Sequence, residues 1–292
     1  MYELINLKGN SYYIQSPAKI GLVKLSDTTV AVIDSGNDKE AGKKVKRHIG
    51  ANSWALSAIY NTHSNADHIG GNRYLATETG CKIYSPGIEC AFTRHPILEP
   101  AFLYGGYPPS ELCHKFLLAE KSDAEPLTDD CLPDGCQTIP LPGHFFDMVG
   151  YRTADNVVYL ADCLSSAATL DKYRIGFIYD VAAYLDSLER VMSLDADVFV
   201  PSHADPTDNI RPLARLNIDC VNSVAADILK ICSSPTSFER ILATLFSSYS
   251  LTMTFEQHAL VGSTLRSYLS WLKSTGHLTA HLEDNMLLWT RT

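Results

Sequence analysis

The stretch that decides the fold is N-T-H-S-N-A-D-H at residues 61–68, which follows the apolar run W-A-L-S-A-I-Y at 54–60. His63, Asp67 and His68 fall within six positions of one another, in a polar loop directly after an expected strand. Imidazole and carboxylate are ligands that Zn²⁺ accepts in proteins. A lone histidine is more often structural, but three ligand-type residues this close together indicate a metal site.

Three more segments repeat this arrangement of an apolar strand followed by a ligand-type residue. T-I-P-L-P-G-H leads to His144, V-V-Y-L-A-D leads to Asp162, and V-F-V-P-S-H leads to His203. Each residue alone could equally be a turn residue or a satisfied polar group. Because sites in α/β folds assemble at the carboxyl ends of strands, we expect all three to join the 61–68 loop.

The pattern around these segments is that of an α/β protein. Apolar runs bounded by turn residues predict strands, and apolar residues at helical spacing predict helices. Strands are expected within 11–34, 54–63, 81–86, 137–141, 148–152, 156–162 and 197–201, and helices over 38–49, 72–80 and 181–194. Alternation of this kind predicts a sheet with covered faces.

Two regions depart from this alternation. Residues 88–127 are dense in proline, glycine and aromatic residues, which predicts an insertion of irregular chain and short helices that lies over the site or on the surface. From 213 to 275 the apolar residues form three helical blocks, and a short hairpin follows with its turn at 283–285. We therefore place a boundary near 209–212, between a first domain of residues 1–209 and a winged-helix-like domain of residues 212–292.

The order H-x-x-x-D-H, P-G-H, A-D and P-S-H resembles the metallo-β-lactamase superfamily, which includes glyoxalase II-like thioesterases, lactonases and β-lactamases. The resemblance covers about residues 10–208 and is specific for fold more than for substrate. It implies a four-layer αββα sandwich, with two sheets face to face, helices outside and two metals between the loops. The C-terminal helices and hairpin resemble the winged-helix appendage of some members.

The resemblance also divides the candidate ligands between two metals that share one carboxylate. The first metal would take His63, Asn65 and His144, the second Asp67, His68 and His203, and Asp162 would bridge the two. Asn65 departs from the pattern, because most relatives place a histidine there and an amide oxygen is a weaker donor to Zn²⁺. We expect a tight second site and a weak or substituted first site. The cofactor is then one or two Zn²⁺ ions, with iron or manganese as alternatives.

This donor set indicates a hydrolase that activates water on a metal, with Asp67 as a further candidate for orienting the nucleophile. No G-x-S-x-G serine motif is present, so a covalent route is disfavoured. The substrate class is a small ester, thioester, lactone, amide or phosphoester. Two alternatives stay open: a nucleic-acid-acting metallohydrolase that uses the winged helix as its binding domain, and a degenerate metal-binding protein without activity.

Composition bears on partners and compartment. The formal net charge is −9, and the expected recognition helix at about 255–273 carries only Arg266 and Lys273 as cations, so nucleic-acid binding is disfavoured. The C-terminal segment would instead pack on the catalytic domain or form a homodimer contact. The N-terminus shows no signal-peptide pattern, and no run of 18 apolar residues exists. We therefore expect a cytoplasmic protein without membrane contact, whose eight cysteines are reduced, and a secreted β-lactamase is disfavoured.

Overall fold

The computed structural model describes residues 2–292, which form two sheets packed face to face and a small third sheet at the C-terminus. The first sheet runs in the order β1 (Leu4–Lys8), β2 (Ser11–Ile14), β3 (Ile20–Lys24), β4 (Thr29–Ile33), β5 (Ala55–Tyr60), β6 (Lys82–Ser85) and β7 (Glu125–Pro126). The second runs in the order β11 (Val198–His203), β10 (Val157–Ser165), β9 (Val149–Arg152) and β8 (Gln137–Pro140).

The helices fall into three groups along the chain. Those of the N-terminal half are α1 (Lys39–Ala51), α2 (Ala66–Ile69), α3 (Asn72–Thr79), α4 (Glu89–Arg94) and α5 (Leu98–Tyr104). Those after β10 are α6 (Ala167–Tyr173) and α7 (Val181–Ser193). The C-terminal segment contains α8 (Arg211–Ile231), α9 (Phe238–Ser248) and α10 (Phe255–Ser274), with the strands β12 (Thr236–Ser237), β13 (Leu278–Glu283) and β14 (Met286–Arg291).

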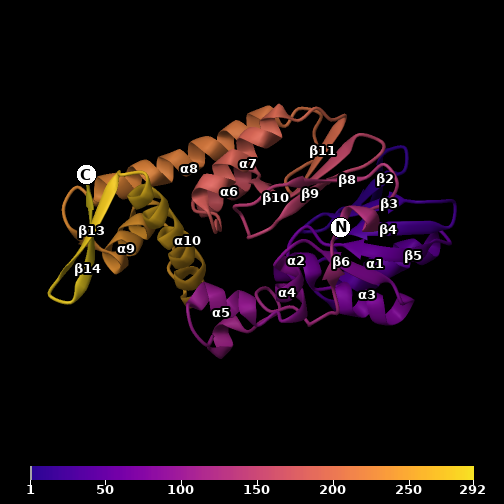
Figure 1. The fold of residues 1–292 in the computed structure, drawn as a ribbon, viewed down its shortest axis with the longest axis horizontal. Helices are drawn as coiled ribbons and strands as arrows, with labels where there is room; N and C mark the ends of the chain where they lie inside the picture. Colours follow the sequence, from indigo (N-terminus) through magenta and orange to yellow (C-terminus); the bar gives the residue numbers. More distant parts are fainter. Residues whose placement is uncertain (1) are drawn as a thin grey trace.

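Buried side chains define four layers, as expected. One cluster lies between the two sheets, where Tyr60 and Tyr151 meet. A second cluster packs the other face of the first sheet against α1 and α3 through Val45 and Leu75. A third packs the outer face of the second sheet against α7 and α8 and includes Leu188. The order of layers is therefore helix, sheet, sheet, helix (Figure 1), and the α/β αββα expectation is confirmed.

The pairing of strands brings the candidate ligand loops to one edge of the sandwich. Strands β4, β5 and β6 are parallel neighbours, and so are β10 and β11. Parallel neighbours end at the same edge of a sheet, so the loops after β4 and β5 open together in the first sheet and those after β10 and β11 in the second. The clustering of His63, Asp162 and His203 with their neighbours shows that the two edges meet. The first strand, β1, and the helix α6 were not predicted from the sequence.

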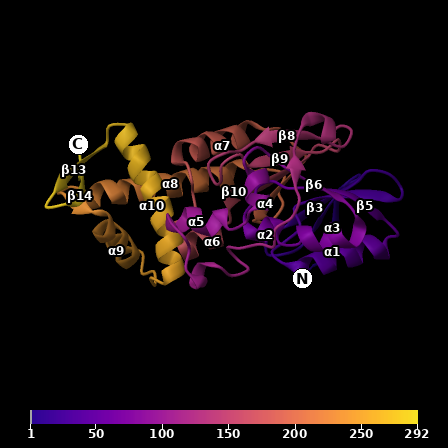
Figure 2. The ribbon, with the colours of Figure 1, turned by 60° about the horizontal axis from the view of Figure 1, so that its bottom comes forward.

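The C-terminal segment packs against the rest of the chain through buried side chains. The core cluster on the outer face of the second sheet continues through α8 into α9 and α10. Helix α10 also contacts α5 and the 3₁₀ turn Ser110–Leu112 of the 88–127 insertion (Figure 2). Three helices precede the terminal hairpin, whose turn residues Asp284 and Asn285 have positive φ. That residues 212–292 form a separate winged-helix-like domain stays a prediction.

Two further expectations concern the chain as a whole. No helix among residues 2–292 is long and apolar enough to cross a bilayer. All eight cysteines are unpaired, including Cys131 and Cys136, whose closeness in sequence invites a disulfide. Cys163, directly after Asp162, is fully buried in the outer core, and the cysteines contribute no atom to the candidate metal clusters described next.

Candidate metal centre

The 61–68 loop is held at the end of β5 and turns directly into the short helix α2. The backbone N–H of Asn61 donates to the carbonyl of Tyr84 on the neighbouring strand, and Asn65 occupies the position before the first residue of α2. His63 and His68 are fully buried at the two ends of this turn. Their rings lie 4.1 Å apart, centre to centre, so the loop folds both imidazoles into one small space.

The structure brings the other predicted residues to this loop from the second sheet. His203 is the last residue of β11, and His144 follows β8 in a loop. Asp162 differs from the expectation, because β10 continues past it to Ser165. The strand register shifts around Ala161, whose φ is +51°, and this irregularity lies directly before Asp162.

Two clusters of ligand-type atoms result, and they share Asp162. One consists of Asp67, His68, Asp162 and His203, and the other of His63, His144 and Asp162. Within each cluster the ligand-type atoms lie within 4.8 Å of one another. The structure brings together the same residues that the resemblance groups, apart from Asn65, whose amide is considered below.

The donor atoms fit a bound cation. His63 Nε2, His68 Nε2 and Asp162 Oδ1 are buried and form no hydrogen bond, although the last two lie close to each other. His68 Nε2 lies 3.0 Å from Asp162 Oδ1, and His203 Nε2 lies 3.1 Å from Asp162 Oδ2. Two ligands of a tetrahedral zinc site are separated by about 3.3 Å, given bonds of about 2.0–2.1 Å. Buried polar atoms normally have a hydrogen-bond partner or a ligand. Buried atoms that lack one and lie at this spacing therefore indicate that they bind the same cation.

Each histidine turns its other ring nitrogen outward to a hydrogen-bond acceptor. The Nδ1 pairs are His63 with Thr62 Oγ1 (2.9 Å), His68 with Asp34 Oδ2 (2.7 Å), His144 with the Phe177 carbonyl (3.0 Å) and His203 with the Pro17 carbonyl (3.1 Å). Carboxylate and carbonyl oxygens only accept, so the proton lies on Nδ1 of the rings that face them. Nε2 of a neutral ring then offers a lone pair to the centre, the arrangement found around metal-ligating histidines.

Asp34 is a site residue that was not predicted from the sequence. It follows β4, is 2% exposed and has a φ of +63°. Its carboxylate accepts hydrogen bonds from the backbone N–H and the hydroxyl of Thr62, as well as from His68. The signal was present, because T-V-A-V-I-D ends in an acid after an apolar strand, as V-V-Y-L-A-D does.

Asn65 faces two neighbours at once. Its amide nitrogen donates to Glu99 Oε1 at 2.7 Å, and its Oδ1 lies 3.1 Å from His144 Nε2. Since His144 Nδ1 donates to Phe177, the neutral ring presents a lone pair toward the amide oxygen. Two acceptors this close repel each other unless a proton or a cation lies between them. The amide oxygen thus borders the cluster of His63 and His144.

The 88–127 insertion anchors the metal loop from outside with two buried acids that were not predicted from the sequence. Glu99 is 4% exposed and Glu89 is fully buried. Glu89 accepts from the N–H and hydroxyl of Ser64 and from the N–H of Asp147. Burial raises the pKa of Glu89 to about 7 and that of Glu99 well above its usual range. The insertion therefore contributes structure to the site.

Charge is distributed unevenly between the two clusters. The Asp162 carboxylate raises the pKa of His203 to about 10, and burial lowers the pKa of His63 and of His144. Although burial favours the neutral acid, His68 and His203 lower the pKa of Asp67 to about 2. The cluster with Asp67 has two carboxylates and the other cluster has one, so it would attract a divalent cation more strongly once the cation displaces the protons from its histidines.

Replacement of Asp34 with asparagine should weaken metal binding, although Asp34 touches no metal position itself. Loss of the carboxylate removes the charged acceptor that fixes the His68 ring, and such changes typically cost about 10- to 100-fold in metal affinity. The measurement is a competition titration with a zinc chelator, with Asp27→Asn as an exposed control. An unchanged affinity in Asp34→Asn would show that the His68 ring is held by packing alone.

Fold and site together define an αββα protein with a cluster of histidines and aspartates able to bind metal. The model of the metallo-beta-lactamase superfamily matches residues 7–203, and the chain belongs to this superfamily. Its members are typically hydrolases and depend on metal.

Individual relatives add detail on fold. A crystal structure of a beta-lactamase domain protein from Burkholderia ambifaria superimposes with a TM-score of 0.76 and 15% identity, and covers 99% of this chain and 94% of that one. A metallo-beta-lactamase family protein from Thermus thermophilus gives a TM-score of 0.73 and 16% identity, and the match covers 97% of this chain and 99% of that one. Both likenesses extend through the C-terminal segment, and at this identity they show the fold alone.

Sequence relatives are similar only over short segments. A hydroxyacylglutathione hydrolase from Erythrobacter litoralis is 39% identical over 56 residues, which is 19% of this chain and 21% of the relative. Another, from Pseudomonas entomophila, is 36% identical over 69 residues, which is 24% of this chain and 26% of the relative. The chain thus matches about a fifth to a quarter of the length of these curated relatives.

Proposed function

We propose that the protein is a metal-dependent hydrolase that cleaves a small ester, thioester, lactone or phosphoester with activated water. One observation carries this proposal: two clusters of metal-ligand atoms share the carboxylate of Asp162 at the open edge of the sandwich. The short likenesses to hydroxyacylglutathione hydrolases agree with a thioester or ester substrate. We propose zinc as the cofactor, because imidazole and carboxylate suit it, with iron or manganese as alternatives.

The residues have separate tasks in this proposal. A first ion would be held by His63, His144 and Asn65. A second ion would be held by Asp67, His68 and His203, and Asp162 would bind both ions. A divalent ion held there would supply hydroxide at neutral pH, by lowering the pKa of a coordinated water from 15.7 to about 7. Asp67 is ionised and partly exposed, so it can also accept a hydrogen bond from the nucleophile and orient it.

Nucleic acid is a weaker candidate substrate. Helix α10, the expected recognition helix, packs against α5 and α7, so part of its surface is covered. Its guanidinium from Arg266 lies 4.2 Å from the centre of the Phe238 ring, and its Glu256 pairs with His114 at 2.8 Å. A helix with these neighbours offers few free cations to phosphate. We propose a small-molecule substrate and a cytoplasmic setting.

A substrate panel with and without metal tests the proposal. Protein stripped by a chelator and reloaded with zinc should hydrolyse at least one member of a panel of short esters, thioesters, lactones and phosphodiesters. The stripped protein should lose the activity, because the nucleophile in this proposal is a water activated by the metal. Activity that survives removal of the metal would contradict the mechanism. A zinc-loaded protein inactive on the whole panel would favour the degenerate metal-binding alternative, and a gel-shift with duplex DNA and RNA tests the nucleic-acid one.

A further inference from the structure

One carboxylate at the start of α4 contacts both loops that carry the histidines of the first cluster. Glu89 is the first residue of α4 and is fully buried. Its Oε2 accepts hydrogen bonds from the backbone N–H and the hydroxyl of Ser64, the residue after His63. Its Oε1 accepts one from the backbone N–H of Asp147, three residues after His144, at 2.9 Å. A single side chain thus joins a loop of the first sheet to a loop of the second.

The loop that carries His144 holds α4 in return. Asp147 Oδ2 accepts a hydrogen bond of 2.8 Å from the backbone N–H of Ile88, directly before α4. Gly87 lies against the same carboxylate with a φ of +39°, and a Cβ at this position would overlap it. Glycine is therefore required here. Because each segment accepts from the backbone of the other, Glu89 and Asp147 together fix the distance between α4 and this loop.

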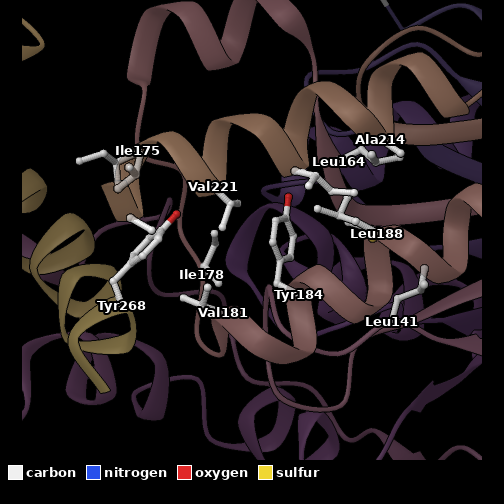
Figure 3. Packing of buried hydrophobic residues seen from close by; sticks show 14 of the residues in the cluster. Leu141, Leu164, Ile175, Ile178, Val181, Tyr184, Leu188, Ala214, Val221 and Tyr268 are labelled. Carbon is white, nitrogen blue, oxygen red and sulfur yellow. The ribbon is translucent and has the colours of Figure 1, made fainter. Parts of the chain in front are cut away.

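The other contacts that hold the two loops lie next to the strands. The backbone N–H of Val149 donates to the carbonyl of Thr62, the residue before His63, at 2.9 Å. Leu141, at the start of the loop of His144, is fully buried in the core cluster on the outer face of the second sheet (Figure 3). Strands β5 and β8 belong to different sheets, so no ladder of hydrogen bonds between them fixes the distance between the loops that follow. The α4 carboxylate adds a tie within the loops themselves.

The second cluster is held by other groups. Asp67 and His68 follow in the same segment but belong to α2, and the His68 ring donates to Asp34. His203 comes from β11, and its ring donates to the Pro17 carbonyl. These supports do not involve α4, so a change at its first residue should act mainly on the first cluster.

We propose that Glu89 is a positioning residue for the first metal, which sets the placement of His63 relative to His144 and thereby the affinity of the first site. The rings of these two histidines lie 5.3 Å apart, centre to centre. The inference rests on the two-ion arrangement of the proposed function, and it gives the insertion a part in binding one ion and not the other. Because Asn65 makes this site weak, its occupancy depends strongly on how well the two histidines are placed.

Replacement of Glu89 with glutamine tests this inference without turnover. The amide keeps the size of the side chain and turns one of its two acceptor atoms into a donor, which would then face a backbone N–H of Ser64 or Asp147. Zinc titration to saturation against a chromophoric chelator should show the weaker equivalent loosened by about tenfold or more and the tighter one unchanged within about twofold, as for the loss of an outer partner of one site. A general loss of stability would weaken both equivalents, so the ratio of the two affinities is the readout.

Two further variants separate position from charge and from folding. Ser64→Ala keeps the Glu89 carboxylate and removes only a hydroxyl donor, so it should loosen the weaker equivalent by a smaller factor, about threefold. It decides by the same ratio if Glu89→Gln does not fold. Glu120→Gln makes the same chemical change at an exposed glutamate of the insertion and should leave both equivalents unchanged.

The possible results distinguish this inference from the proposed function. An unchanged ratio in Glu89→Gln, an equal loss at both equivalents, or a single zinc equivalent in the wild type overturns the inference. Because the titration does not measure hydrolysis, a selective loss in a protein that cleaves nothing on the substrate panel would overturn only the proposed function.

Discussion

Replacement of Asp162 with asparagine should lower kcat/KM by about 10³-fold, the largest loss that we expect from a single change. The two carboxylate oxygens lie 3.0 Å from His68 Nε2, 3.1 Å from His203 Nε2 and 3.7 Å from His144 Nε2, so this residue faces both clusters. Asparagine keeps the size and removes the charge. Loss of several kcal/mol of electrostatic stabilisation, taken as about 4 kcal/mol, corresponds to this factor.

Two measurements check the Asp162 prediction. Steady-state kinetics on the best substrate of the panel give kcat/KM, and elemental analysis after gel filtration gives the metal content, which should fall below that of the wild type. Asp130→Asn, a change at an exposed aspartate, serves as the matched control. Activity within tenfold of the wild type at full metal content would show that Asp162 is not the shared ligand.

Much of the metal centre could be predicted because its signal is local. His63, Asp67 and His68 lie in one loop, and His144 and His203 follow apolar strands that are recognisable one at a time. Neighbouring parallel strands then bring their ends together without any further information. Asp162 shows the limit, since the irregularity at Ala161 places it within β10 and no feature of V-V-Y-L-A-D indicated the bend.

The groups that support the centre were harder to predict, because tertiary packing decides their role. Glu89 and Glu99 lie in the 88–127 segment, which was expected over the site or on the surface, and acidic residues are rarely buried without partners. Asp34 is different, because its place after β4 carries the same signal as Asp162 and was recognisable in the same way.

Replacement of Asn65 with histidine should tighten the weaker of the two metal equivalents by on the order of 10²-fold, because a neutral amide oxygen gives way to an imidazole nitrogen that Zn²⁺ prefers. The wild type should bind one zinc ion tightly, at Asp67, His68, Asp162 and His203, and a second weakly. The surroundings suit the change: Glu99 lies 2.7 Å from the Asn65 amide nitrogen and could accept the N–H of the new ring. That would create the carboxylate–histidine pair that supports metal ligands elsewhere in proteins.

Titration with limiting and then excess zinc against a chromophoric chelator distinguishes the two equivalents. Asn65→Ala is the matched variant, and it should leave the tight equivalent in place while weakening the other further, because the amide oxygen beside His144 is removed. Asn65→His combined with Glu99→Leu should recover only part of the gain, since the ring then lacks its outer acceptor.

Two equally tight equivalents in the wild type would show that the amide serves as a full ligand. No gain in Asn65→His, with an unchanged unfolding temperature, would mean that position 65 orients His144 and does not coordinate. Two causes could make one zinc site tighter than the other: the carboxylates of Asp67 and Asp162, or the amide at position 65. Either result would show that the amide at position 65 is not the cause.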